Sequence, residues 1–262
     1  MQKVYEELTT AFRRNSGKLS KKSYDRIVSK HTTLFEDSDT IFLLLQASGY
    51  PISECKYGYI LETYKTLYKE QKFCVIDIET NGSKPDSAQV IEIGAVMVKN
   101  GKIIDKFESF VFCSFIPEYI TKITGIEPKD LIDAPSISEV LTKLRIFMGE
   151  SIFVAHNANF DYGFLNYSFD HFGLGTIGNP KLCSIDLAKR TIESQKYGLA
   201  YLNESLELGV ETHHRAYSDA LTTAKLLSIL FDNLPSYVKT TDELLRFSIS
   251  SKRERTKINN KK

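Results

Sequence analysis

Two carboxylates interrupt a strand-like stretch of this chain, FCVIDIETNG at residues 73–82. The side chains of a β-strand alternate between its two faces, so Asp77 and Glu79 point the same way. Burying two neighbouring carboxylates is costly unless a cation compensates their charge. Because the strand ends at the turn signal Asn81-Gly82, both acids lie at a strand end, where α/β sheets usually form active sites. An edge strand with two solvated acids is the alternative interpretation.

Charge is distributed unevenly along a chain of ordinary globular composition, 42% hydrophobic and 26% charged. Residues 71–251 carry 17 basic and 23 acidic residues, so contacts of this part with nucleic acid would depend on metal ions and local groups. The tail 252–262 carries six basic residues and one acidic residue, which fits either phosphate affinity or a disordered end. No apolar run approaches the ~20 residues of a membrane span, and the start lacks a signal-peptide core. We therefore expect an intracellular, cytoplasmic protein.

Three regions are expected: a small, mostly helical N-terminal domain at 1–70, a main domain at 71–235, and a C-terminal helix with the basic tail at 236–262. Within the first region, a helix is predicted from about 54 to 69. Its basis is a set of apolar residues at helical spacing, namely Tyr57, Ile60, Leu61, Tyr64, Leu67 and Tyr68. Residues 1–70 contain no catalytic constellation, and both protein contact and nucleic-acid contact are open as their role.

The main domain begins as strands and continues as alternating strands and helices. The first strand and the segments 89–99 and 102–111 predict an antiparallel meander, because Asn100-Gly101 is a strong hairpin signal. Short strands at 152–155 and 181–184 then alternate with helices, which predicts an α/β fold with a mixed sheet flanked by helices. Short helical turns are expected at 116–136, and helices at 136–149, 159–172, 185–193, 199–208 and 216–232. Glu92, in the second strand, faces either the acids or solvent, and we favour a structural role for it.

Three further residues repeat the chemistry of the first strand. Asp161 falls in the first turn of a helix, Asp219 falls near the start of the last strong helix, and His214 precedes it by five residues. A helix N-terminus favours a carboxylate through its dipole, and a loop histidine can reach over a site held by rigid elements. Four acids and one histidine suit oxygen-ligated Mg²⁺ or Mn²⁺ with an adjacent base, and they do not suit zinc.

The motifs VIDIETNG, ITGI, HNANFD and HRAYSDA follow one another in this order. Together they resemble the DEDDh branch of the DnaQ-like 3′→5′ exonucleases over about residues 72–232, most closely the epsilon proofreading subunits of bacterial DNA polymerase III. The resemblance implies an RNase H-like fold and hydrolysis of nucleotides from DNA 3′ ends with two divalent metal ions, Mg²⁺ or Mn²⁺. It also implies a single-stranded DNA 3′ end as substrate and the polymerase III catalytic subunit as a partner.

The resemblance assigns roles position by position. Its metal ligands correspond to Asp77, Glu79, Asp161 and Asp219, and its general base to His214. His213 is adjacent, but the spacing to Asp219 favours His214, which leaves His213 as a neighbouring loop residue. Nucleotide contacts are assigned to Ile78, Thr80, Ile123 and Gly125. Asn157 and Phe160 are expected to line the nucleotide channel, with packing as an equal alternative for Phe160.

Two other functions remain open at this stage. An RNA-trimming exonuclease of the same family would use the same metal site, because discrimination depends on groups near the ribose 2′-hydroxyl. A non-catalytic scaffold on the same fold is expected to have lost an acid or the histidine, and all five residues are present. The part after about residue 233 shows no clear clamp-binding motif, so the N-terminal domain is a candidate replacement for a polymerase-binding tail.

Overall fold

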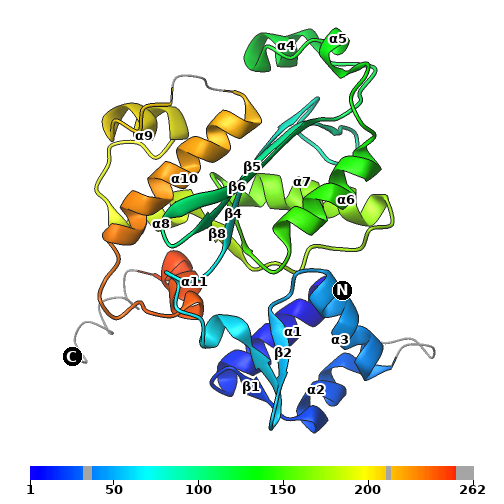
Figure 1. Ribbon diagram of the computed structural model, residues 1–262, viewed down its shortest axis with the longest axis vertical. Coiled ribbons are helices and arrows are strands. Elements are labelled where there is room, and N and C mark those ends of the chain that lie inside the picture. The colour runs from blue at the N-terminus through cyan, green and yellow to red at the C-terminus, as the bar shows by residue number, and fades with distance from the viewer. Residues whose placement is uncertain (32–36, 211–213, 252–262) are drawn as a thin grey trace.

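A mixed five-stranded sheet forms the centre of the computed structural model, which describes residues 1–31, 37–210 and 214–251 (Figure 1). Its strand order is β6-β5-β4-β7-β8. The antiparallel meander comprises β4 (Phe73–Thr80), β5 (Val90–Lys99) and β6 (Lys102–Phe110). On the other side of β4, the strands β7 (Ile152–Ala155) and β8 (Lys181–Cys183) run parallel to it. The predicted α/β fold, with a meander and parallel strands, is confirmed.

Two apolar cores lie on the two faces of this sheet. Phe73 and Val75 of β4 belong to one core, whereas Cys74 and Ile76 belong to the other, as strand alternation requires. Helices α8 (Ser184–Thr191), α9 (Leu199–Ser205), α10 (Ala216–Asp232) and α11 (Thr241–Ile249) supply the first core. Helices α6 (Ile137–Met148) and α7 (Ala158–His171) supply the second. Asp77 and Glu79 therefore extend the face of the sheet that α10 covers.

The helix boundaries follow local signals in the sequence. Ser136 accepts a hydrogen bond from the backbone N–H of Glu139 and starts α6, and Thr240 and Glu243 form a capping box that starts α11. The short helices α4 (Glu118–Thr124) and α5 (Pro128–Leu131) extend beyond the sheet (Figure 1). Among the described helices, none combines the length and apolar character needed to cross a bilayer. The basic tail 252–262 and His213 lie outside the described residues.

The N-terminal segment contains a three-stranded sheet that we did not predict. It comprises α1 (Gln2–Arg14), β1 (Lys18–Leu19), α2 (Lys21–Val28), α3 (Ser38–Ala47), β2 (Ile52–Cys55), β3 (Gly58–Leu61) and the 3₁₀ turn η1 (Glu62–Tyr64). The helix predicted over 54–69 is wrong, because β2 and β3 form a hairpin there. Gly58 has φ +128°, and a Cβ at this position would lie 2.4 Å from the Leu19 carbonyl oxygen. Only glycine permits this close approach of the hairpin to β1.

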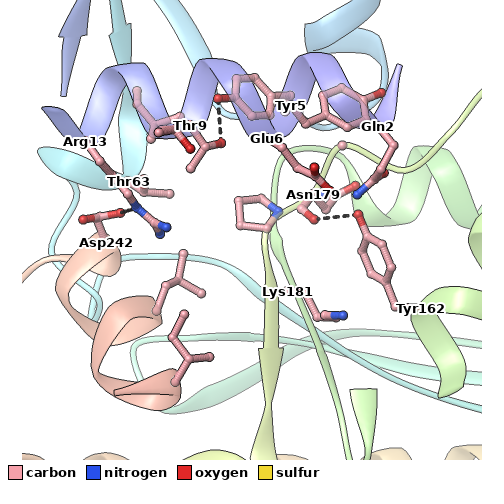
Figure 2. A pocket seen from close by; sticks show the side chains of 17 residues that line it. Gln2, Tyr5, Glu6, Thr9, Arg13, Thr63, Tyr162, Asn179, Lys181 and Asp242 are labelled. Carbon is pink, nitrogen blue, oxygen red and sulfur yellow. Dashed lines mark hydrogen bonds and ion pairs between the residues drawn. The ribbon is translucent and has the colours of Figure 1, made fainter. Parts of the chain in front are cut away.

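Helix α1 joins the N-terminal segment to the sheet domain. The Arg13 guanidinium donates a hydrogen bond to the Asp242 carboxylate of α11 at 3.1 Å, and the hydroxyls of Tyr5 and Thr176 lie 3.1 Å apart. Figure 2 shows the cavity of about 440 Å³ that lies between α1, the start of β8 and α11. None of the predicted site residues lines this cavity.

Candidate active site

The two acids of β4 occupy neighbouring positions on one face near the end of the strand. In the antiparallel ladder, Asp77 is opposite Gly94 and Glu79 is opposite Glu92. The register shifts between Glu79 and Thr80, so a bulge ends the regular pairing directly after the second acid. Both carboxylates are partly buried. This strand end is the first of three elements that form the site.

Asp161 lies in the first turn of α7, the helix that follows the strand next to β4. Strand β7 runs parallel to β4, and the chain turns from β7 into α7 at Asn157, whose φ of +71° is in the left-handed region that asparagine tolerates. Asp161 is 3% exposed, and the backbone N–H groups of Asp161 and Ile78 favour its ionised form. The third acid therefore lies beside Ile78 of β4.

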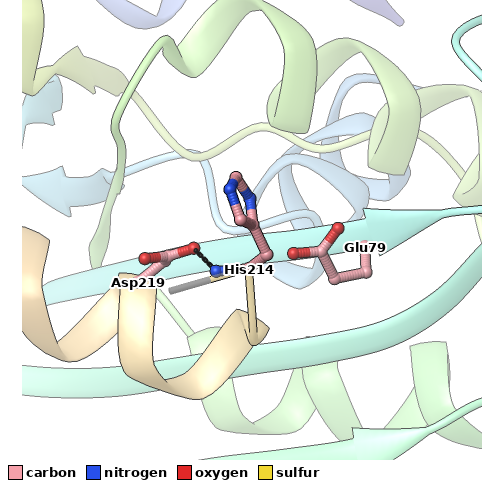
Figure 3. A group of neighbouring side chains, drawn as sticks. All are labelled: Glu79, His214 and Asp219. Atoms are coloured by element: carbon pink, nitrogen blue, oxygen red, sulfur yellow. Dashed lines mark hydrogen bonds between the residues drawn. The ribbon is translucent and has the colours of Figure 1, made fainter. Parts of the chain in front are cut away.

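The third element is the beginning of α10. The backbone N–H of His214 donates to Asp219 Oδ2 at 3.1 Å, and His214 has φ +58°. Figure 3 shows the carboxyl groups of Asp219 and Glu79 on either side of His214. One ligand atom from each of these residues lies within 4.8 Å of the other two. Residues 140 positions apart in the chain therefore share one site.

An ion pair between the buried Glu92 and the half-exposed Arg215 joins β5 to the start of α10. Glu92 is 1% exposed, and it accepts hydrogen bonds from Arg215 Nη2 at 2.7 Å and from the backbone N–H of Ala216 at 3.0 Å. The N-terminus of α10 therefore receives its negative charge from the sheet. The structural role favoured for Glu92 agrees with these contacts. The sequence did not identify Arg215, because its partner is 123 residues away and nothing local marks the pair.

A glycine makes the close approach of α10 possible. A Cβ added to Gly94 would lie 2.1 Å from the backbone nitrogen of Tyr217 and 2.2 Å from the carbonyl carbon of Ala216. Since Gly94 is also the neighbour of Asp77 across the ladder, it determines how near Asp219 comes to the acids of β4. Glycine at this position is a requirement of the site.

Burial and mutual repulsion disfavour the ionised forms of the acids. Burial, followed by the charges of Asp161, Asp219 and Glu79, raises the pKa of Asp77 well above its ordinary value. Burial, followed by the charge of Asp219, raises the pKa of Glu79 to about 8. Burial also raises the pKa of Asp161 to about 7, although the two backbone N–H donors oppose this shift.

This excess of negative charge fits a cation site. Within the described part of the chain, no ion pair involves Asp77, Glu79 or Asp161. The cation that lowers the pKa of Glu79 is Arg215, and its guanidinium is already bound by Glu92. Carboxylate oxygens gathered without a matching side-chain cation are the donor set that Mg²⁺ and Mn²⁺ prefer.

We expect the stabilisation by Mg²⁺ to grow as the pH rises. The pKa values of Glu79 and Asp161 are raised to about 8 and about 7 in the folded protein. Their contribution to stability is therefore fully present below the ordinary carboxyl pKa of about 4 and is lost as the pH rises to about 8. Saturating Mg²⁺ should raise the melting temperature by several degrees at about pH 8 and by almost nothing at about pH 5. Thermal unfolding in Mg²⁺ and in EDTA measures this difference, and equal shifts at both pH values would contradict it.

The predicted nucleotide-contacting residues are divided between two places. Ile78 and Thr80 lie on β4 beside the acids, and Thr80 Oγ1 donates to the Gly82 carbonyl at 2.7 Å. Asn157 and Phe160 lie at the exposed start of α7, near Asp161. Ile123, which is 52% exposed, and Gly125 lie at the end of α4, and no described contact joins them to the acids.

His156 has a structural role next to the site. Its Nε2 lies 2.9 Å from the Tyr197 carbonyl oxygen and must donate to it, so Nδ1 accepts from Ser184 Oγ at 2.8 Å. Burial lowers the pKa of His156 to about 4, although the Tyr197 carbonyl opposes this shift. The neutral ring therefore ties the end of β7 to the start of α8 and to the loop before α9.

Comparison with known proteins identifies relatives of this chain. Proteins named DNA polymerase III PolC-type are 40% identical to this chain over 159 residues in Staphylococcus saprophyticus and over 178 residues in Caldanaerobacter subterraneus. These matches cover 60% and 67% of this chain but 11% and 13% of the relatives, so the chain spans about a tenth of their length.

Solved structures show the same fold. A structure titled "Exonuclease X in complex with 5′ overhanging duplex DNA" is 27% identical, with a TM-score of 0.55 over 67% of this chain and 99% of that chain. Exonuclease I, at 15% identity and a TM-score of 0.57 over 63% of this chain and 42% of that one, shares the fold, and another structure of that enzyme is a zinc-bound form. The family model RNase_T, described as Exonuclease, matches residues 74–227. With its acids gathered where three elements meet, the chain belongs to this exonuclease family.

Proposed function

We propose that this chain is a 3′→5′ exonuclease that removes nucleotides from DNA 3′ ends and depends on two divalent ions, Mg²⁺ or Mn²⁺. The observation that carries the proposal is the convergence of four carboxylates from β4, α7 and α10 beside the exposed His214. The raised pKa of Asp77 shows how strongly these charges interact. A scaffold protein would gain nothing from retaining such a costly cluster.

Each element contributes a distinct part of the chemistry. Asp77, Glu79, Asp161 and Asp219 would hold the ions, and the ions when bound supply positive charge for the phosphate oxygens. Asp219 also accepts the His214 N–H, which fixes the backbone that carries the imidazole. His214 would take the proton from the attacking water, a task for which histidine is suited near neutral pH. Ile78, Thr80, Asn157 and Phe160 would border the terminal nucleotide, and Ile123 and Gly125 would contact the strand from α4.

The relatives suggest where this activity is used. A protein named DNA polymerase III PolC-type contains a segment 40% identical to 159 residues of this chain. We therefore propose proofreading for a replicative polymerase as the context and its catalytic subunit as a partner. RNA trimming is the alternative, because the acids and His214 would act in the same way on either polymer.

Degradation of matched oligonucleotides tests the proposed function. With Mg²⁺, a 5′-labelled single-stranded DNA should shorten stepwise from its 3′ end, and EDTA should stop the reaction. An RNA of the same sequence should be degraded much more slowly. Faster degradation of the RNA would establish the alternative, and a label released first from the 5′ end would overturn the proposed polarity.

Replacing His214 with Ala should lower turnover by about 10²- to 10⁴-fold, because general-base catalysis contributes on this scale. The dissociation constant for Mn²⁺, measured by calorimetry, should change little, since the four carboxylates remain. His171→Ala is the matched control, because His171 is an exposed histidine at the far end of α7. If His214→Ala weakens Mn²⁺ binding as much as loss of an acid does, His214 is a ligand and not the base.

A further inference from the structure

The N-terminal segment has the element order of a winged-helix unit, with three helices and a small sheet whose last two strands form a hairpin. Its elements follow the order α1-β1-α2-α3-β2-β3, and its small sheet has the order β1-β3-β2. It has its own apolar core, to which residues such as Leu8, Phe12, Tyr24 and Tyr59 belong. In DNA-binding proteins built on a helix-turn-helix pair, the second helix enters the major groove and the first crosses the phosphate backbone. Topology alone is only an analogy, so the argument depends on the side chains of this segment.

Four exposed cations lie on α2 and at the tip of the β2–β3 hairpin. We call Lys21, Lys22, Arg26 and Lys56 the basic patch. Lys22 and Arg26 are one helical turn apart and share a face of α2. The hairpin tip lies beside the start of α2, because a Cβ on Gly58 would be 2.7 Å from the backbone nitrogen of Lys21. The hairpin tip that carries Lys56 is therefore close to the start of α2, and Lys22 and Arg26 continue the positive charge along that helix.

Within the part of the chain that the structure describes, Lys22, Arg26 and Lys56 form no ion pair. Among the described residues, the ion pair recorded for the basic patch joins Lys21 to Asp39 at 3.8 Å, with both side chains largely exposed. Such a contact contributes little in water. Tyr57, at the hairpin tip, is 70% exposed, and Lys56 Nζ lies 5.9 Å from its ring centroid. In such a pair, the cation can contact a phosphate and the exposed aromatic ring can stack on a base.

Helix α3 carries no basic side chain. Its exposed side chains include Asp39, Thr40, Leu43 and Leu44. We therefore expect no base-specific contacts from this helix. Contacts with phosphates would be made by the side chains of the basic patch. Residues 71–251, in contrast, carry six more acidic than basic residues, so the main domain has little general attraction for a polyanion.

We propose that the basic patch binds the phosphodiester backbone of DNA, without sequence preference, at a distance from the acid cluster. Figure 1 shows α2 at the lower end of the molecule, opposite α4 and the beginning of α10. A short oligonucleotide in the acid cluster would not reach the basic patch, whereas a long one would. The effect on degradation depends on the function proposed above, but the binding does not.

Binding by the full chain in EDTA tests the proposal separately from catalysis. The patch variant is Lys21→Gln, Lys22→Gln, Arg26→Gln and Lys56→Gln together. The control variant removes the same charge from four exposed lysines elsewhere: Lys3→Gln, Lys102→Gln, Lys143→Gln and Lys189→Gln. Fluorescence anisotropy with DNA of about 40 nucleotides, single-stranded or duplex, should show at least about tenfold weaker binding for the patch variant and less than about twofold for the control.

The salt dependence identifies the contact as one with phosphates. The slope of log K against log salt should fall by about 0.7–0.9 for each phosphate contact that the patch variant loses. If bases stack on Tyr57, the Tyr57→Ala variant should bind single-stranded DNA more weakly. If this variant binds normally, and single-stranded and duplex DNA bind equally well, the contact is with the phosphate backbone alone. Equal affinities for the patch and control variants, with unchanged melting temperatures, would overturn the proposal. Loss of binding without loss of cleavage on DNA of about five nucleotides would support it.

Discussion

Replacing Asp77 with Asn should reduce Mg²⁺-dependent degradation of single-stranded DNA by about three orders of magnitude or more. A bound metal ion stabilises the charge on the phosphate in the transition state by several kcal/mol. Each 1.4 kcal/mol changes the rate by a factor of about ten. Asp77 is central to the cluster, because its pKa is raised by the charges of Asp161, Asp219 and Glu79 after burial. Asp161→Ala should have the same effect. The measurement is the rate of 3′-end shortening at saturating substrate.

The same Asp77→Asn protein should be more stable than the parent when no metal is present. Removing one of several mutually repelling carboxylates lowers the electrostatic cost of the folded state. Thermal unfolding in EDTA at about pH 8 should therefore show a higher melting temperature, and added Mg²⁺ should raise it less than in the parent. Asp105→Asn is the matched control, because Asp105 is an exposed residue of β6. Full activity of the purified Asp77→Asn protein would refute the assignment of Asp77 as a ligand.

Replacing Gly94 with Ala should both destabilise the protein and inactivate it. The new Cβ would overlap backbone atoms of Ala216 and Tyr217 at 2.1–2.2 Å, and backbone cannot rotate away as a flexible side chain can. Overpacking of this kind costs about 1–3 kcal/mol or more. Since α10 must move away from β5, Asp219 should lose its place beside Glu79. We expect a melting temperature lower by several degrees and at least about a hundredfold loss of turnover, because a displacement of about 1 Å has that cost.

Gly163→Ala is the comparison for this substitution. Gly163 lies within α7, and a Cβ there would meet no atom within 4 Å. Alanine in a helix is more favourable than glycine by about 1 kcal/mol, so this variant should be slightly more stable and fully active. If Gly94→Ala behaves in the same way, the packing of α10 on β5 does not control the site.

The sequence was informative where one residue's role depends on its own local element. Alternation along β4 correctly placed Asp77 and Glu79 on one face, and Asp161 and Asp219 fall in the first turns of α7 and α10, as predicted. The metal and base roles of these residues stay predictions. The contact between Glu92 and Arg215 could not be predicted, because it joins a strand to a helix across 123 residues.

The N-terminal sheet was missed for a different reason. Its strands have only two to four residues, too few for alternation to show against the helical spacing of Ile60, Leu61 and Tyr64. The deciding feature is the contact of Gly58 with the backbone of Leu19 and Lys21, which is tertiary. A periodicity argument over a short window cannot detect such a contact.

The ion pair between Arg13 and Asp242 has a practical consequence for anyone who wishes to work with the nuclease part by itself. The Asp242 side chain is 3% exposed, and its guanidinium partner lies in α1. Truncation before residue 71 would remove Arg13 together with the side chains of α1 and of residues 61 and 63 that line the same cavity as Asp242 and Leu245. Leu245, which is 7% exposed in the full chain, would then face solvent, so low solubility of a shortened protein should first be traced to this newly exposed surface.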